Sequence, residues 1–110
     1  MERKIVLVLA VLLSSSLLLN AAAYKGQRVY AKHCVSCHGR QPFIQSKTKK
    51  EWEKILEARG KNLAQLHTKD EKAKPSWEYF KSKKYNKKVK HLRDFFVEYA
   101  KDSGKVPACN

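Results

Sequence analysis

The hydrophobic positions divide the chain into an apolar first segment and a longer segment in which apolar residues recur at helical spacing. Residues 5–13 form an unbroken apolar run, and residues 17–19 and 21–23 extend it with Leu and Ala. From Tyr24 onward the apolar residues return every three or four positions, which is the spacing of helices that bury one face. No stretch alternates apolar and polar residues as a half-buried strand does. The pattern therefore predicts a small all-α fold.

The first half of this longer segment predicts two helices. We expect a helix over 24–38 and then a loop over 39–47. Thr48 and Glu51 have the spacing of a capping box, in which a hydroxyl and a carboxylate satisfy the free amides at a helix start. Gly60 is a typical helix end, so the second helix is expected to stop there.

The second half predicts one irregular segment and two further helices. Residues 62–74 are mostly polar and are expected to be irregular. A short helix is expected to open at Pro75 and to carry Trp77 and Phe80, because proline is favoured in a first turn. A last helix is expected over 86–102. Its buried side should hold Val89, Leu92, Phe95, Phe96 and Tyr99.

Residues 1–23 have the organisation of an export signal. Arg3 and Lys4 precede the apolar run, and Ala21 and Ala23 give the small-x-small pattern before a signal-peptidase cleavage site. An uncleaved membrane anchor is the alternative, because residues 5–23 are just long enough to span a bilayer. We expect cleavage, a mature chain of residues 24–110 that forms one domain, and a location in the periplasm.

The composition of the mature part points to a missing apolar component. The whole chain has 24 Lys and Arg against 10 Asp and Glu, a formal charge of +14. After residue 23, Leu, Ile, Val and Phe number 15 of 87 residues, below the ~20% that marks disorder in highly charged chains. Either this part is disordered, or a group outside the polypeptide supplies the apolar mass of its core.

Cys34, Cys37 and His38 form the Cys-x-x-Cys-His signature of c-type haem attachment. Residues three apart lie on one face of a helix, so both thiols can reach one edge of a porphyrin. A thioredoxin-type redox pair is the first alternative, but it requires a preceding strand that the pattern lacks. A zinc site is the second, and it requires a second ligand pair. Export and the adjoining histidine favour haem.

The segment around this signature resembles the amino-terminal helix of class I cytochromes c. The shared residues are Gly26, Tyr30, the Cys34-x-x-Cys37-His38 motif and Gly39. The resemblance implies three to four helices around one covalently bound haem c, held by thioethers at Cys34 and Cys37, with His38 as proximal iron ligand. It further implies a close crossing of Gly26 by the last helix, and a monohaem carrier of single electrons.

The distal iron ligand departs from the family pattern, in which a methionine precedes the last helix. Met1 is the single methionine of the sequence and would leave with the signal. His67 is the leading candidate; His91, a lysine, Cys109 and an open position remain alternatives. Bis-histidine ligation predicts a lower potential than His/Met ligation. An open or labile site would instead bind CO, NO or peroxide. No further catalytic residues accompany these histidines, so we expect no enzymatic activity.

The charge predicts the class of partner. A lysine-rich stretch over 81–90 would steer the protein toward an acidic redox partner or an anionic membrane surface, unless it is simply a solvated face. Nucleic-acid binding also suits a basic chain, but export removes that substrate. Cys109 has no intramolecular partner once haem uses the other two cysteines, so it permits a disulfide-linked dimer beside the monomer.

Overall fold

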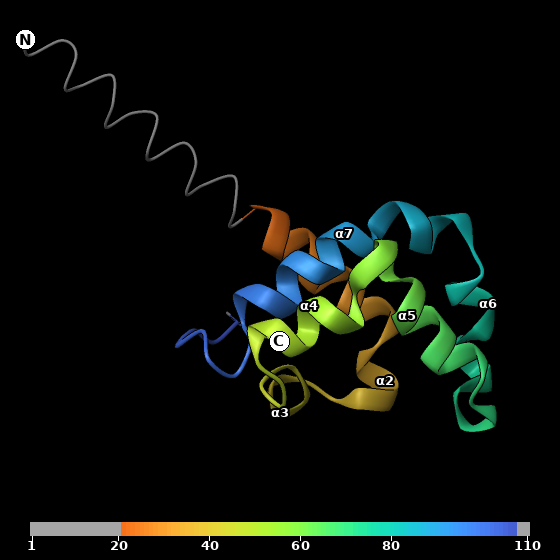
Figure 1. Ribbon diagram of the computed structural model, residues 1–110, viewed down its shortest axis with the longest axis horizontal. Coiled ribbons are helices and arrows are strands. Elements are labelled where there is room, and N and C mark those ends of the chain that lie inside the picture. The colour runs from red at the N-terminus through yellow and green to blue at the C-terminus, as the bar shows by residue number, and fades with distance from the viewer. Residues whose placement is uncertain (1–20, 108–110) are drawn as a thin grey trace, which may run out of the picture.

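The computed structural model describes residues 21–107, and these form an all-α fold with no strand among them, as predicted (Figure 1). The predicted signal therefore lies outside the described residues, apart from its last three positions. None of the helices within 21–107 is long and apolar enough to cross a membrane. The first helix covers residues 21–33. It is followed by α2 (Val35–His38), α3 (Gln41–Ile44), α4 (Lys49–Ile55), α5 (Glu57–Thr68), the 3₁₀ helix η1 (Glu71–Ser76), α6 (Trp77–Phe80) and α7 (Lys83–Glu98).

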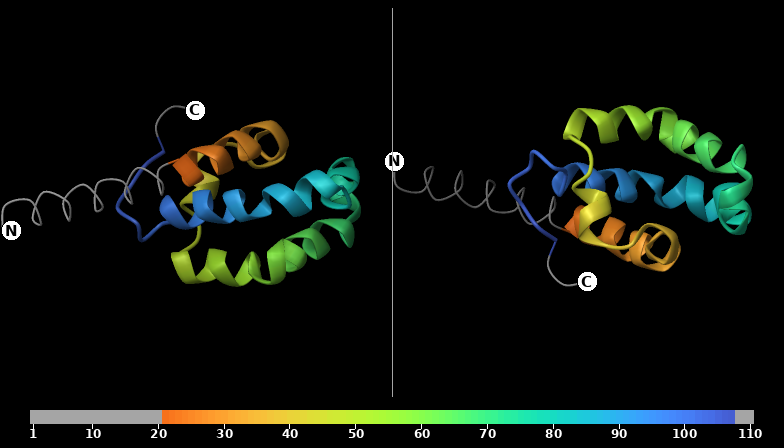
Figure 2. Two further views of the ribbon diagram at one scale, coloured as in Figure 1. Left: turned by 90° about the horizontal axis from the view of Figure 1, so that it is seen from above. Right: turned by 90° about the horizontal axis from the view of Figure 1, so that it is seen from below.

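The helix α7 lies between the first helix on one side and the α4–α5 segment on the other (Figure 2). Its crossing with the first helix is close at Gly26, where an added Cβ would stand 1.9 Å from the carbonyl oxygen of His91. The Tyr30 ring lies 5.6 Å from the rings of both Phe95 and Phe96. The close crossing implied by the resemblance is therefore confirmed.

The capping box at the start of α4 is also confirmed. The Thr48 hydroxyl accepts the backbone N–H of Glu51, and the Glu51 carboxylate accepts that of Thr48. This start orients Trp52, which is buried and donates its Nε1–H to the carbonyl oxygen of Ile44 at 2.8 Å. The indole stacks on Phe96 of α7 with ring centroids 4.4 Å apart.

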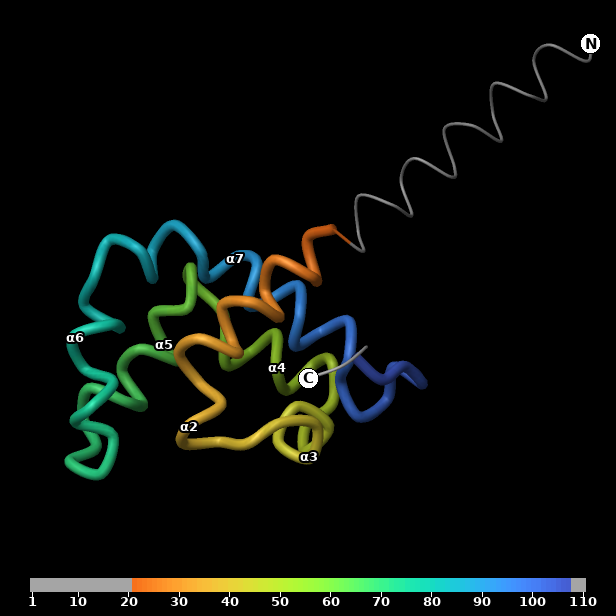
Figure 3. The backbone as a smooth tube through the Cα atoms, turned by 180° about the vertical axis from the view of Figure 1, so that it is seen from behind, coloured from red at the N-terminus to blue at the C-terminus, as the bar shows by residue number. Residues whose placement is uncertain are grey.

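Two segments expected to lack helix are helical. Within 39–47 the chain forms α3, where Pro42 stands in the first turn and Ile44 is buried. Figure 3 follows the chain from the first helix through α2 and α3 to α4. The expectation for 62–74 was also wrong, because α5 continues to Thr68 and η1 follows it. The predicted stop at Gly60 is a left-handed break, after which the helix resumes.

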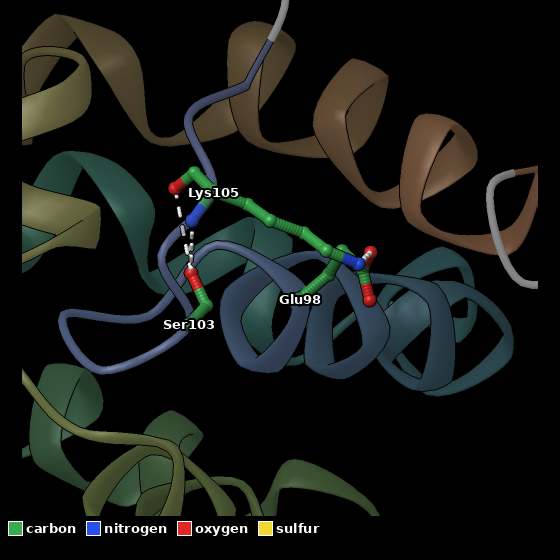
Figure 4. A network of polar contacts seen from close by, with 3 residues as sticks. All are labelled: Glu98, Ser103 and Lys105. Carbon is green, nitrogen blue, oxygen red and sulfur yellow. Dashed lines mark hydrogen bonds and ion pairs between the residues drawn. The ribbon is translucent and has the colours of Figure 1, made fainter.

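The last helix begins and ends earlier than the expected 86–102. Ser82 caps its start by accepting the N–H of Tyr85. After Glu98 the chain turns back, and Lys105 forms an ion pair with Glu98 at 2.7 Å while its N–H bonds to the Ser103 hydroxyl (Figure 4). The predicted buried side is correct: four of its five residues are buried, and Tyr99 is partly buried against them.

Candidate functional site

The Cys-x-x-Cys-His motif lies where the first helix gives way to α2. The backbone changes direction at Cys34, so the expected single helix over 24–38 is interrupted there. The N–H of His38 bonds to the carbonyl oxygen of Cys34 at 3.0 Å, which keeps the motif in a helical turn. The Tyr30 hydroxyl donates to the carbonyl oxygen of Gly39. A residue one turn before the motif therefore braces the residue that follows it.

The motif borders an apolar cavity of about 140 Å³ between α2 and α5. The rings of His38 and His67 lie there with their centroids 5.9 Å apart and their planes nearly perpendicular, at 87°. One edge of the cavity is open, since Leu66 in its lining is 56% exposed. The other lining residues are Cys34, Phe43, Lys47, Trp52, Ile55, Leu63, Phe80, Leu92 and Phe96.

His38 is held as a neutral imidazole. Its ring stacks on Phe43 with centroids 4.1 Å apart. Loss of water around the ring, and next the neighbouring His67, lower the pKa of His38 below its ordinary value. A neutral imidazole is the form that binds a metal ion, because its free nitrogen lone pair is the donor.

His67 is positioned by three contacts. Its Nδ1 lies 2.8 Å from the carbonyl oxygen of Leu63, and because a carbonyl only accepts, Nδ1 carries the proton. In a neutral ring with this tautomer the lone pair lies on Nε2, which is the arrangement typical of metal-binding histidines. Phe80 stacks on the ring at 4.2 Å between centroids. Trp77 donates its Nε1–H to the His67 carbonyl oxygen at 2.7 Å and so fixes the backbone.

Cys34 does not have the lowered pKa of a reactive redox thiol. Cys34 and Cys37 are both free thiols. Burial, and then the neighbouring Cys37, raise the pKa of Cys34 to about 12, whereas reactive thiols have lowered pKa values. Within residues 21–107 no three His, Cys, Asp or Glu side chains gather as a metal-binding group, so the described residues give no zinc site.

The donor set fits a haem. Two thiols stand three residues apart, one imidazole follows them, and a second imidazole lies in the same apolar lining with its ring centroid 5.9 Å from the first. The cavity is narrower than a porphyrin requires, so the aromatic rings that border it must part to admit one. Phe43, Leu63 and Phe80 were not predicted as site residues, since each shows in the sequence only as one more apolar position.

The other candidate ligands lie elsewhere or at the rim. His91 lines a different groove together with Glu53 and Glu57, and its buried Nδ1 has no hydrogen-bond partner among residues 21–107. Lys47 is the one charged residue in the described lining of the cavity, and its Nζ lies 6.0 Å from the centroid of the Trp52 ring. Cys109 lies outside the described residues. Of the candidates within them, His67 is the one whose ring faces His38.

In a comparison with protein-family models, residues 21–92 match the family described as "Cytochrome C oxidase, cbb3-type, subunit III". The matched region contains the motif, His67 and most of α7. No curated protein and no solved structure matched the chain.

Proposed function

This chain belongs to the family of cbb3-type cytochrome c oxidase subunit III, and from this premise we propose that it is an exported carrier of single electrons whose haem iron is held between His38 and His67. As a cytochrome c domain it contains covalently bound haem c and has an electron-carrier role. Haem c supplies a one-electron iron couple, and the protein sets its potential and access.

We assign the attachment to the motif. Cys34 and Cys37 hold the porphyrin edge through thioethers, and His38 is the proximal ligand. The bonds from Tyr30 to Gly39 and from His38 to Cys34 support this assignment, because they fix the direction of the imidazole relative to the thiols. Phe43 stacks on the imidazole and limits its rotation.

The proximity of the His38 and His67 rings in the lining of one apolar cavity is the observation that carries the distal assignment. The Leu63 carbonyl keeps the proton of His67 on Nδ1 and leaves Nε2 as the donor. None of residues 21–107 is a methionine, so no thioether from this part of the chain competes. Two imidazoles donate more strongly to ferric iron than an imidazole and a thioether, which lowers the potential.

The remaining parts of the proposal concern location and partners. The apolar run and the Ala21-x-Ala23 pattern support export to the periplasm with cleavage near residue 23. The net charge of +14 supports redox partners with acidic docking surfaces. We assign no catalytic reaction to the chain itself, and we infer that it works as a monomer or as a Cys109-linked dimer.

The optical spectrum of the reduced holoprotein, recorded before and after addition of CO, tests the distal assignment. Pyridine haemochrome analysis first establishes that the haem is covalent. We expect a low-spin spectrum that CO leaves unchanged over minutes, because both axial positions are taken. Rapid CO binding by the unaltered protein would contradict the assignment and favour a ligand-binding haem protein.

Two variants separate His67 from the other candidate histidine. His67→Ala should bind CO rapidly and should raise the reduction potential, while His91→Ala should keep the low-spin spectrum, because His91 lines a different groove. The opposite result, an open site in His91→Ala alone, would move the distal ligand to α7. Mass spectrometry of the secreted protein measures the cleavage site, and retention of residues 1–23 would identify a membrane anchor.

A further inference from the structure

A basic groove lies between the first helix and α7, apart from the haem cavity. It has a volume of about 680 Å³. Lys25, Arg28 and Lys32 line it from the first helix, and Lys88 lines it from α7. The described residues of its lining include no Asp or Glu. The sequence pattern showed the lysines of 81–90 alone, whereas the fold adds three cations that lie 56 or more residues before Lys88.

The floor of this basic groove adjoins the segment that binds haem. His33 and Tyr79 line the groove, and their rings stack with centroids 3.7 Å apart. His33 directly precedes Cys34 in the chain. Tyr79 also contacts Phe80, with ring centroids 5.5 Å apart, and Phe80 in turn stacks on His67. A molecule in the groove is therefore separated from His67 by two aromatic rings, those of Tyr79 and Phe80, and from Cys34 by His33, its neighbour in the chain.

The Tyr79 hydroxyl oxygen is buried and makes no hydrogen bond among the described residues. Buried polar groups are nearly always satisfied, so an orphan of this kind calls for a partner that the chain itself does not supply. The burial of this oxygen keeps it out of reach of a docked molecule, so the contacts that the groove offers are those of its lysines and arginine, which pair with carboxylates.

We propose that an acidic surface of a redox-partner protein docks in the basic groove, with its carboxylates on Lys25, Arg28, Lys32 and Lys88. The proposal rests on the electron-carrier function and names the surface through which it acts. On docking, the one electron lost by the reduced partner is gained by the oxidised one, in either direction, and no bond forms or breaks.

A protein fits this groove better than a membrane does. Peripheral membrane binding combines cations with apolar side chains that insert between lipids. The strongly exposed large apolar residues among 21–107 are Tyr24, Leu66 and Val106, and none of them lines the groove. Val29 and Ala31, its apolar members, are too short to reach out of a concave surface.

The test uses oxidation of the reduced holoprotein by hexacyanoferrate(III), an anion that accepts one electron, followed by stopped flow. The variant is Lys32→Glu/Lys88→Glu, and the matched control is Lys50→Glu/Lys54→Glu. The control changes the net charge equally on α4, which lies on the other side of α7 (Figure 2). The same rates are measured with tris(phenanthroline)cobalt(III), an oxidant of the opposite charge. They are also measured with hexacyanoferrate(III) in the presence of poly-L-glutamate, which competes for the cations of the groove.

We expect the second-order rate constant with hexacyanoferrate(III) at low ionic strength to fall at least tenfold in the groove variant and no more than threefold in the control. The difference should shrink at high salt, poly-L-glutamate should inhibit the control but not the groove variant, and the cationic oxidant should not be slowed. Equal slowing of the two variants would overturn the proposal, because net charge alone would then explain the rates.

Two further measurements, the haem spectrum and vesicle binding, distinguish loss of the docking surface from other effects of the substitutions. An altered haem spectrum in the groove variant would show damage at the haem site, and Lys32→Gln/Lys88→Gln then replaces it, with the same ordering expected. Binding of both variants to phosphatidylglycerol vesicles tests whether the groove binds an anionic membrane instead of a protein. Loss of vesicle binding in the groove variant, together with an oxidation rate equal to that of the control, would make the groove a lipid surface and overturn the docking proposal.

Discussion

Gly26→Ala tests the helix crossing that builds the haem-binding half of the protein. The new Cβ would stand 1.9 Å from the His91 carbonyl oxygen and 2.6 Å from the Cβ of Phe95. A carbon–oxygen contact needs ~3.3 Å, so the two helices would have to part by more than about 1 Å. Neither obstacle is the end of a flexible side chain, and neither can move without its helix.

The magnitude follows from two opposing terms. Overpacking as severe as this costs about 3 kcal/mol, and the parted helices also loosen the contacts of Tyr30 with Phe95 and Phe96, at about 0.5 kcal/mol each. Alanine in place of glycine returns about 1 kcal/mol of helix propensity. We expect a net loss of about 3 kcal/mol, which lowers the Tm by roughly 12–24 °C in a domain of this size.

Thermal unfolding of the holoprotein, followed by circular dichroism at 222 nm, measures the effect. The control is Gly104→Ala, where φ is +70° and no atom lies within 4 Å of the added Cβ. That control carries only the conformational cost of a left-handed alanine, about 1–2 kcal/mol. If Gly26→Ala were as stable as Gly104→Ala, the reasoning from the close crossing would be refuted.

Three further predictions concern a helix cap, a ligand support and the haem itself. Thr48→Ala removes the hydroxyl that accepts the Glu51 amide and should cost about 1 kcal/mol in urea unfolding; Thr48→Ser should restore most of it, and an unchanged midpoint would contradict the cap. Trp77→Phe removes the hydrogen-bond donor to the His67 carbonyl oxygen and should lower the free energy of unfolding by about 1–2 kcal/mol. It should also speed CO binding, because His67 is held less firmly. An unchanged rate of CO binding would contradict the role of Trp77 in positioning His67. Cys34→Ala/Cys37→Ala removes the attachment of the haem, and with the haem goes apolar burial worth on the order of 10 kcal/mol. Far-UV circular dichroism should therefore show a largely unfolded chain, and native helix content would count against a haem-dependent fold.

The features that were predicted correctly from the sequence depend on residues within one helical turn of each other, or on apolar residues spaced so that one side of a helix is buried. The capping box needs only Thr48 and Glu51, which lie within one turn of each other. The buried side of α7 follows from the spacing of its apolar residues, and Tyr30 meets Phe95 across the crossing. The role of Gly26 came from the resemblance, because spacing alone does not indicate which helix crosses a glycine.

The features that it missed depend on contacts between distant residues. The segment after Gly60 has few apolar positions, yet it is helical up to Thr68, and Trp77 holds its end through the His67 carbonyl. The sequence named His67 from its place before the last helix and from the lack of a suitable methionine. Its position opposite His38 depends on α5, which was expected to be irregular.

The left-handed turn over Ala58, Arg59 and Gly60 separates α4 from the rest of α5 and so determines which of their residues reach the candidate haem site. Their φ angles are 52°, 57° and 74°, and the first two cost about 1–2 kcal/mol each, because they carry a Cβ. The turn is held against α7, since the Tyr85 hydroxyl donates to the Gly60 carbonyl and Val89 packs on Gly60.

A straight helix in its place would separate two residues that the cavity requires together. Trp52 and His67 are fifteen positions apart in the sequence, so an unbroken helix would put them about 22 Å apart at 1.5 Å per residue. In the structure both line the same small cavity. The bend at 58–60 shortens that separation and turns His67 toward His38. The strained turn is therefore part of the architecture that builds the candidate haem site, even though none of its three residues lines the cavity.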